Sequence, residues 1–332
     1  MPTAQTLPER APWWLRGGHA QTIWASQGAQ VRSAQPQAAW QRERWATPDG
    51  DFLDVDRLPA SALSRPLVVL FHGLEGSRQS HYARAFAAWA SAQDLNLALP
   101  HFRGCSGELN LAPRAYHSGD HQEIHWILQR LRAAHRAEGG QQLVAAGVSL
   151  GGNALMVWAG EQGASAAQLA DAVASISSPL DLTASGHQIG RGLNRWIYTP
   201  YFLRSMVPKA LAKLRQHPGL FDEQALRRAR TLEDFDNVFT APLHGFADTA
   251  DYWRRASALP RLASLRIPAL LLNARNDPFI PADSLPGAQQ VSSSVRLWQP
   301  AEGGHVGFVA GAFPGDLGIL PQTVGAWLLK PS

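Results

Sequence analysis

The serine at position 149 stands between two glycines in the sequence GVSLG, residues 147–151. This pattern is common by chance, and a small residue in a glycine-rich turn is the alternative interpretation. However, the apolar run 143–146 predicts a buried strand before it, and residues 154–158 predict a helix after it. A Gly-x-Ser-x-Gly turn between a strand and a helix exposes the serine hydroxyl at a sharp bend. We therefore predict that Ser149 is a nucleophile and that Gly147 and Gly151 are required where side chains would collide.

A serine hydroxyl needs a base that removes its proton, and the base needs a carboxylate that orients it. Asp277 follows the apolar run 269–273, and His305 follows the run 295–298. Both runs predict strands, and ligands of parallel sheets bind beyond the carboxyl ends of the strands. We therefore predict Asp277 as the orienting acid and His305 as the base, in the chain order serine, aspartate, histidine.

A third turn, His72-Gly73-Leu74, leaves the predicted strand 67–71. At this place a backbone N–H can pair with the N–H that follows the nucleophile. We expect the N–H groups of Leu74 and Leu150 to form an oxyanion hole. An ordinary strand-ending turn, with His72 in a structural role, is the alternative.

Other side chains with chemical potential have simpler interpretations. A metal site is conceivable for one stretch with histidines at four-residue spacing, but the order typical of helical zinc sites is absent and a capped helix is favoured. The residues concerned are His117, Asp120, His121, Glu123 and His125. In that helix, Asp120 and Glu123 are predicted to form a capping box. Asp248 and Asp251 are expected on a surface or lid, and Cys105 is expected to be a small loop residue.

Continuous apolar runs alternate with helical patterns along the chain and predict the fold. Strands are expected at 67–71, 96–100, 143–146, 172–176, 269–273 and 295–298, and helices at 82–92 and 120–134. Because these strands are apolar on both faces, the sheet should be mostly parallel with helices on both sides. An antiparallel hairpin over 44–58, with Asp49-Gly50 in its turn, should lead the sheet.

The region 180–262 interrupts this alternation with helical, aromatic-rich sequence. We expect a helical lid there, inserted between a first core part, 1–179, and a second core part, 263–332. The alternative is that the aromatic side chains fill a small core of their own.

Composition limits the class of protein. The chain has 332 residues, 45% of them hydrophobic, a formal net charge of +4 and one cysteine, as expected for a globular protein of a reducing compartment. The densest basic run, 227–230, lies between acidic residues, which favours a solvated helix face over a nucleic-acid site. The N-terminus lacks the apolar core of a signal peptide, and the charge-free run 139–160 contains too many glycines for a membrane span. We therefore expect a cytoplasmic protein.

Several motifs together resemble the YheT-like branch of the α/β-hydrolase fold superfamily. They are His19-Ala20-Gln21-Thr22, His72-Gly73-Leu74-Glu75-Gly76-Ser77, Arg103-Gly104-Cys105-Ser106-Gly107, Tyr116-His117-Ser118-Gly119, Gly147–Gly152, His244-Gly245-Phe246, Asp251-Tyr252, Asn276-Asp277-Pro278-Phe279 and Gly303–Phe308. The resemblance implies an α/β-hydrolase fold with a helical lid insertion and a serine hydrolase whose charge relay falls on Ser149, Asp277 and His305. It also implies relatives that act on carboxylic esters, medium-chain acyl esters or phospholipids, some of which transfer acyl groups.

Together these features predict a serine esterase that needs no cofactor or metal and acts on short- to medium-chain acyl esters. Acyl transfer to an alcohol and phospholipid hydrolysis at the same site are alternatives. A non-catalytic binding module on a hydrolase scaffold is a further alternative. A small acyl ester is the expected partner, and the oligomeric state stays open.

Overall fold

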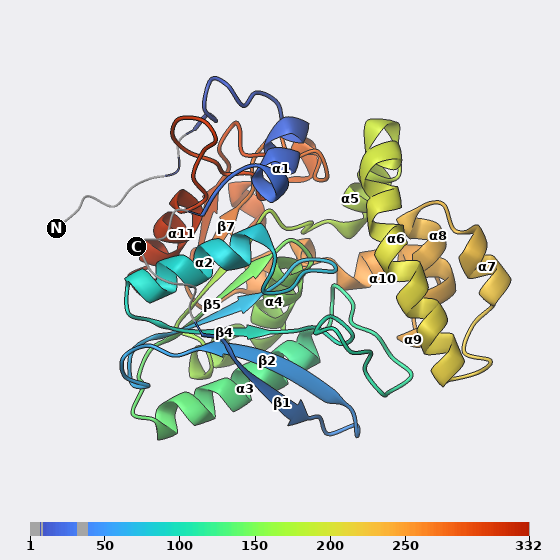
Figure 1. Cartoon of the computed structure of the whole chain (residues 1–332), viewed down its shortest axis with the longest axis horizontal. Helices are drawn as coiled ribbons and strands as arrows, with labels where there is room; N and C mark the ends of the chain where they lie inside the picture. Colours follow the sequence, from blue (N-terminus) through green and yellow to red (C-terminus); the bar gives the residue numbers. More distant parts are fainter. Residues whose placement is uncertain (1–6, 8, 32–38, 332) are drawn as a thin grey trace.

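The computed structural model describes residues 7, 9–31 and 39–331. Its centre is an eight-stranded sheet with the order β1-β2-β4-β3-β5-β6-β7-β8 (Figure 1). The strands are β1 (Gln41–Ala46), β2 (Phe52–Leu58), β3 (Leu67–Phe71), β4 (Asn96–Pro100), β5 (Leu143–Val148), β6 (Ala172–Ile176), β7 (Ala269–Leu272) and β8 (Val295–Trp298). Each predicted strand is present, and the predicted α/β-hydrolase architecture is confirmed.

Most strands pair in parallel, as strands covered on both faces do. β3 to β8 are parallel, whereas β1 and β2 form an antiparallel hairpin that joins the sheet through antiparallel pairing of β2 with β4. β5 extends to Val148, two residues beyond the predicted end, because Gly147 and Val148 pair with Ser175 and Ile176 of β6. The strand therefore delivers the chain directly to Ser149.

Helices cover both faces of the sheet. Alternate side chains of β3 point to opposite sides, so that Val68 and Leu70 pack with α2 (His81–Ala92) and α11 (Ile319–Leu329). Val69 and Phe71 pack on the other face with α3 (His121–Ala137) and α4 (Leu150–Gln162). Two apolar layers thus hold the sheet, as a doubly wound fold requires.

The predicted capping box at the start of α3 is wrong. Asp120 is the N-cap residue, but its side chain makes no capping hydrogen bond. Its carboxylate instead binds the Arg114 guanidinium, and the Glu123 carboxylate accepts a hydrogen bond of 2.6 Å from Arg103 Nε. Tertiary ion pairs therefore use both carboxylates.

Between β6 and β7 the chain forms helices that lie to one side of the sheet (Figure 1). They are α5 (Leu182–Ile189), α6 (Gly192–Gln216), α7 (Glu223–Arg228), α8 (Leu232–Phe235), the π-helix η2 (Asp236–Thr240), α9 (Ala241–Leu243), α10 (Thr249–Ala256) and the 3-10 helix η3 (Leu259–Ser264). Part of their aromatic side chains fill small apolar clusters, for example Phe235 with Phe239 and Tyr252 with Trp253.

The N-terminal helix α1 (Gly18–Gln27) packs against the loops that precede α11. The remaining elements are short 3-10 turns: η1 (Gly163–Gln168), η4 (Ala282–Ser284) and η5 (Ala288–Gln290). In the described ranges, no helix combines the length and the apolar character that are needed to cross a bilayer.

Candidate active site

The turn between β5 and α4 holds Ser149 in a conformation that few residues adopt. Its φ is 53° and its ψ is −120°, a region that costs free energy for a residue with a side chain. A Cβ on Gly147 would lie 2.5 Å from Gly151 O, and one on Gly151 would lie 2.4 Å from His72 O. A third glycine is equally restricted, because a Cβ on Gly152 would lie 2.0 Å from Ser178 Oγ. The close approach of the turn to itself, to the loop after β3 and to Ser178 thus explains the glycine-rich sequence.

Ser149, Asp277 and His305 come together at the carboxyl ends of β5, β7 and β8. His305 Nε2 lies 3.0 Å from Ser149 Oγ, and His305 Nδ1 lies 2.9 Å from Asp277 Oδ2. The Asp277 side chain is fully buried, whereas that of His305 is 12% exposed. In the tautomer whose Nδ1–H points to Asp277, Nε2 can accept a hydrogen bond from the Ser149 hydroxyl.

Neighbouring groups hold Asp277 and His305 in place. Asp277 Oδ1 accepts a hydrogen bond of 2.8 Å from the Phe279 N–H. The Phe279 ring lies 4.3 Å from the His305 ring, centre to centre. One carboxylate oxygen of Asp277 is therefore bonded to the Phe279 backbone N–H, and the other is bonded to the His305 imidazole.

Sequence reasoning missed the role of α1 at this site. Gln21, which is fully buried, accepts hydrogen bonds through Oε1 from Asn276 Nδ2 (2.9 Å) and from the Gly303 N–H (3.0 Å). Thr22 Oγ1 accepts one of 2.9 Å from the His305 N–H. The motif His19-Ala20-Gln21-Thr22 was the available signal, and its Gln21 and Thr22 side chains contact the loops that carry Asp277 and His305.

The loop after β3 lies against Ser149 and is fixed on both sides of Leu74. The Gly73 N–H donates to Tyr82 Oη and the Glu75 N–H donates to Tyr116 Oη, each at 2.9 Å. Within the described part of the chain, the N–H groups of Leu74 and Leu150 have no hydrogen-bond acceptor. Both amides are therefore available to a ligand beside Ser149.

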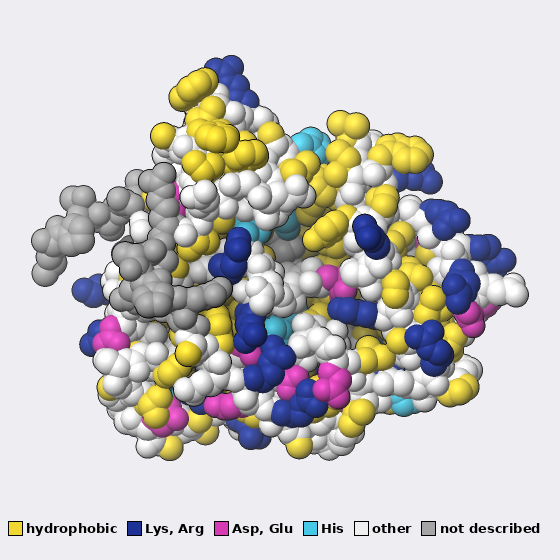
Figure 2. Space-filling model, in the orientation of Figure 1, with side chains coloured by type: hydrophobic (Ala, Val, Ile, Leu, Met, Phe, Trp, Pro, Cys, Tyr) yellow, Lys and Arg dark blue, Asp and Glu magenta, His cyan; other side chains and the backbone are white. Residues whose placement is uncertain are grey.

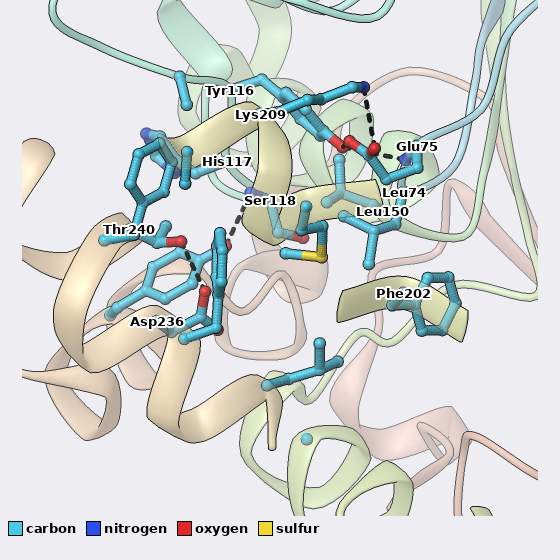
Figure 3. A pocket seen from close by; sticks show the side chains of 18 of the residues that line it. Leu74, Glu75, Tyr116, His117, Ser118, Leu150, Phe202, Lys209, Asp236 and Thr240 are labelled. Atoms are coloured by element: carbon cyan, nitrogen blue, oxygen red, sulfur yellow. Dashed lines mark hydrogen bonds and ion pairs between the residues drawn. The ribbon is translucent and has the colours of Figure 1, made fainter. Parts of the chain in front are cut away.

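A cavity of about 150 Å³ reaches Ser149 from the helices that follow β6 (Figure 3). Its walls are mostly apolar and include Leu74 and Leu150 from the core and Phe202, Met206, Phe235 and Phe239 from those helices. An ion pair of 2.8 Å joins Lys209 Nζ of α6 to Glu75 Oε2, which connects these helices to the loop after β3. The site therefore combines an apolar cavity with the polar groups around Ser149.

One buried acid also lines this cavity. Asp236 accepts hydrogen bonds from Thr240 Oγ1 (2.6 Å) and Trp253 Nε1 (3.0 Å), and burial raises its pKa to about 6. The hydrogen bond from Trp253 joins the π-helix η2 to α10, which gives this carboxyl a structural role.

The remaining sequence candidates have other contacts, although His117 lines the same cavity as Ser149. No group of three or more histidine, cysteine, aspartate or glutamate side chains among the described residues could hold a metal ion. His125 Nδ1 accepts a hydrogen bond of 3.3 Å from Trp158 Nε1, and burial lowers the pKa of His117 to about 3. Asp248 caps α10 by accepting from the Asp251 N–H at 2.7 Å. Burial raises the pKa of the Cys105 thiol to about 12, so the thiol stays protonated.

Comparisons with known proteins agree with this fold. A family model described as the alpha/beta hydrolase fold matches residues 66–312. The chain is 36% identical to YheT of Escherichia coli (strain K12), over 87% of this chain and 84% of that protein. It is 28% identical to phospholipase ABHD3 of Mus musculus, over 88% of this chain and 72% of that protein. The solved esterase Pf2001 of Pyrococcus furiosus shares the fold, with a TM-score of 0.56 and 16% identity over 91% of this chain and 96% of that one.

The chain therefore belongs to the α/β hydrolase fold family and, within it, to the YheT-like branch. Membership of this family of esterases and lipases makes the protein a hydrolase.

Proposed function

We propose that the protein is a serine hydrolase that cleaves carboxylic esters of short- to medium-chain acids through an acyl-enzyme. The observation that carries the proposal is the position of His305, whose two ring nitrogens lie 3.0 Å from Ser149 Oγ and 2.9 Å from Asp277 Oδ2. This arrangement of hydroxyl, imidazole and buried carboxylate is the one that activates a serine for acyl transfer.

In the proposed reaction, Ser149 Oγ attacks the ester carbonyl while His305 Nε2 takes the hydroxyl proton. The carbonyl oxygen becomes an oxyanion that accepts hydrogen bonds from the Leu74 and Leu150 N–H groups. The tetrahedral intermediate collapses as His305 returns the proton to the leaving alcohol. Water then attacks the acyl-enzyme with His305 again as base, which releases the acid and restores Ser149.

The apolar walls of the cavity support an acyl chain as the group that is bound there. The similarity to a protein named phospholipase supports a lipid ester as the substrate class. Since Phe202, Phe235 and Phe239 face this cavity from the helices after β6, we propose that residues 180–262 act as a lid. Residues 1–179 and 263–332 then form the two parts of the core.

The proposal can be tested with p-nitrophenyl esters of graded chain length and a fluorophosphonate probe. Wild-type protein should hydrolyse butyrate and octanoate esters and become labelled at Ser149. Ser149→Ala should lose both properties at an unchanged melting temperature, while Ser26→Ala, at an exposed serine of α1, keeps them. Undiminished hydrolysis by Ser149→Ala would refute the mechanism. Ethyl esters formed in the presence of ethanol would instead identify acyl transfer as a reaction of the same site.

A further inference from the structure

The outer face of α6 carries an unusual stripe of exposed apolar side chains. Residues 193, 196, 197, 200 and 201 follow the spacing that places side chains on one face of a helix. Leu193 is 64% exposed, Trp196 77% and Tyr201 72%. A helix of a globular protein normally turns such a stripe toward the core. Here the stripe faces solvent.

The opposite face of α6 packs against the rest of the protein. Asn194 Nδ2 donates a hydrogen bond of 2.6 Å to Pro278 O, next to the acid Asp277. The Tyr198 ring packs on Phe279 with ring centres 4.5 Å apart, and Phe202 lines the cavity that reaches Ser149. Core packing therefore does not explain the outer stripe, which requires a separate reason.

A second exposed apolar group lies on the loops that adjoin α1. Trp13 is 82% exposed and Phe313 is 67% exposed. A hydrogen bond of 3.1 Å between His19 Nδ1 of α1 and Tyr198 Oη of α6 joins the two regions. Figure 2 shows hydrophobic side chains gathered over the loops next to α1 and, as a separate group, over the start of α6, on the same edge of the molecule with an indentation between them.

The charge along α6 has a single sign. Residues 182–221 contain no aspartate or glutamate. Arg195 and Arg204 are exposed on α6, and neither has an ion-pair partner among the described residues. Arg16 is also exposed, next to Trp13. The face thus offers aromatic and aliphatic side chains together with uncompensated cations.

We propose that this face docks on anionic lipid surfaces, and we call it the docking face: Trp13, Leu193, Trp196, Ile197, Tyr201 and Phe313, with Arg195 and Arg204. Tryptophan and tyrosine prefer the interface of a bilayer, and basic amphipathic helices bind there through buried apolar area plus attraction to anionic headgroups. A second copy of the chain fits less well, because a two-fold contact would bring the same uncompensated arginines together.

Docking would bring the cavity to the source of its substrate, since α6 supplies both the docking face and part of the cavity wall. This step rests on the proposed function: it identifies the substrate as an acyl ester that resides in a lipid surface. Binding to lipid itself is independent of catalysis and can be measured separately.

The test is co-sedimentation of the full chain with sucrose-loaded vesicles of phosphatidylcholine and phosphatidylglycerol at low salt. Wild type should bind these vesicles and should bind pure phosphatidylcholine vesicles much more weakly. Trp196→Gln/Ile197→Gln should weaken binding about tenfold or more, because two interfacial side chains are lost. Leu63→Gln/Leu111→Gln, which removes exposed leucines elsewhere, is the matched control and should bind like wild type.

A second variant removes two positive charges and leaves the apolar stripe unchanged. Arg195→Gln/Arg204→Gln should weaken binding to the anionic vesicles by about tenfold and leave binding to neutral vesicles unchanged. Wild type that stays in the supernatant, or variants that bind as tightly as wild type, would overturn the proposal. So would a dimer of the wild type that Trp196→Gln/Ile197→Gln converts to a monomer without lipid.

Ser149→Ala separates this proposal from the proposed function. It should sediment with vesicles like wild type while it hydrolyses no ester. Vesicle binding together with ester hydrolysis that survives Ser149→Ala would refute the serine mechanism and leave the docking face standing. For the substrate class, the ratio of hydrolysis of a vesicle-embedded ester to that of a water-soluble ester should fall about tenfold in Trp196→Gln/Ile197→Gln. An unchanged ratio would refute the surface-borne substrate.

Discussion

The amide side chains of Gln21 and Asn276 hydrogen-bond to each other at 2.9 Å, although 255 residues separate them. Through this contact, α1 meets the loop that carries Asp277. Asn276 Oδ1 also accepts from the N–H groups of Gly303 (3.0 Å) and Gly304 (2.9 Å), just before His305. Two side chains thus tie the loop that carries Asp277 to the loop that carries His305.

We predict that Gln21→Leu lowers kcat by about 10- to 100-fold with a smaller effect on KM, because a shift of His305 by a fraction of an ångström disturbs proton transfer more than substrate binding. Steady-state kinetics with p-nitrophenyl butyrate measure this. Gln27→Leu, at an exposed position of the same helix, is the control and should behave like wild type. Equal changes in both variants would show that Gln21 has no positioning role.

Gly151→Ala should destabilise the fold by about 2 kcal/mol or more, because the new Cβ would lie 2.4 Å from His72 O in a packed backbone. Urea unfolding measures the loss. Gly287→Ala is the control, since its Cβ meets only Gln290 Oε1 at 3.8 Å. A Gly151 variant as stable as the control would mean that the turn relaxes easily.

Tyr116→Phe should lower kcat by about tenfold, since the Glu75 N–H loses its acceptor and the loop that presents the Leu74 amide is no longer held on that side. The comparison is with Tyr201→Phe, which removes a hydroxyl from an exposed tyrosine. A change in KM alone would indicate that Tyr116 contributes only to the cavity wall.

The stability of the protein should depend on the neutral state of His72. Its Nδ1–H donates to Gly73 O (2.7 Å), Nε2 accepts from the Phe102 N–H (3.0 Å), and burial lowers its pKa to about 3. Because the unfolded histidine has a pKa near 6.5, the unfolded state binds more protons between these values. The stabilisation by this group is therefore complete above pH 6.5 and is lost as the pH falls toward 3.

His72→Gln keeps a donor and an acceptor but cannot titrate. Between pH 6 and 4, the free energy of unfolding of wild type should fall more steeply than that of the variant, by up to about 1.4 kcal/mol per pH unit. Urea titrations at a series of pH values measure the difference. His121→Gln controls for the loss of a partly exposed histidine, and identical slopes for wild type and His72→Gln would contradict the assignment.

The strands and the residues of the candidate site were predictable from sequence for one physical reason. A strand buried on both faces must be apolar throughout, as in residues 67–71, and parallel strands end at one edge of the sheet. Ser149 and Asp277 each follow such a run, and His305 follows the partly buried edge strand β8, so local sequence was sufficient to predict that the three would lie at one edge of the sheet.

Long-range polar contacts were not predictable in this way. Asp120 and Glu123 have the spacing of a capping box, yet Arg114 and Arg103 bind their carboxylates. Likewise, the motif that contains Gln21 suggested no partner in Asn276. Hydrogen bonds and ion pairs of this kind depend on which side chains the folded chain brings within 3 Å, and no local pattern encodes that.

The sequence by itself therefore determined the order of strands and helices, the sharp turn at Ser149 and the identity of its proposed partners, because burial and chain reversal act locally. Only the tertiary structure decided how α1 supports His305, which helices enclose the cavity and that the apolar stripe of α6 faces solvent. The hydrophobic period of α6 is the same whichever way the helix turns, and packing against Pro278 and Phe279 selected the orientation.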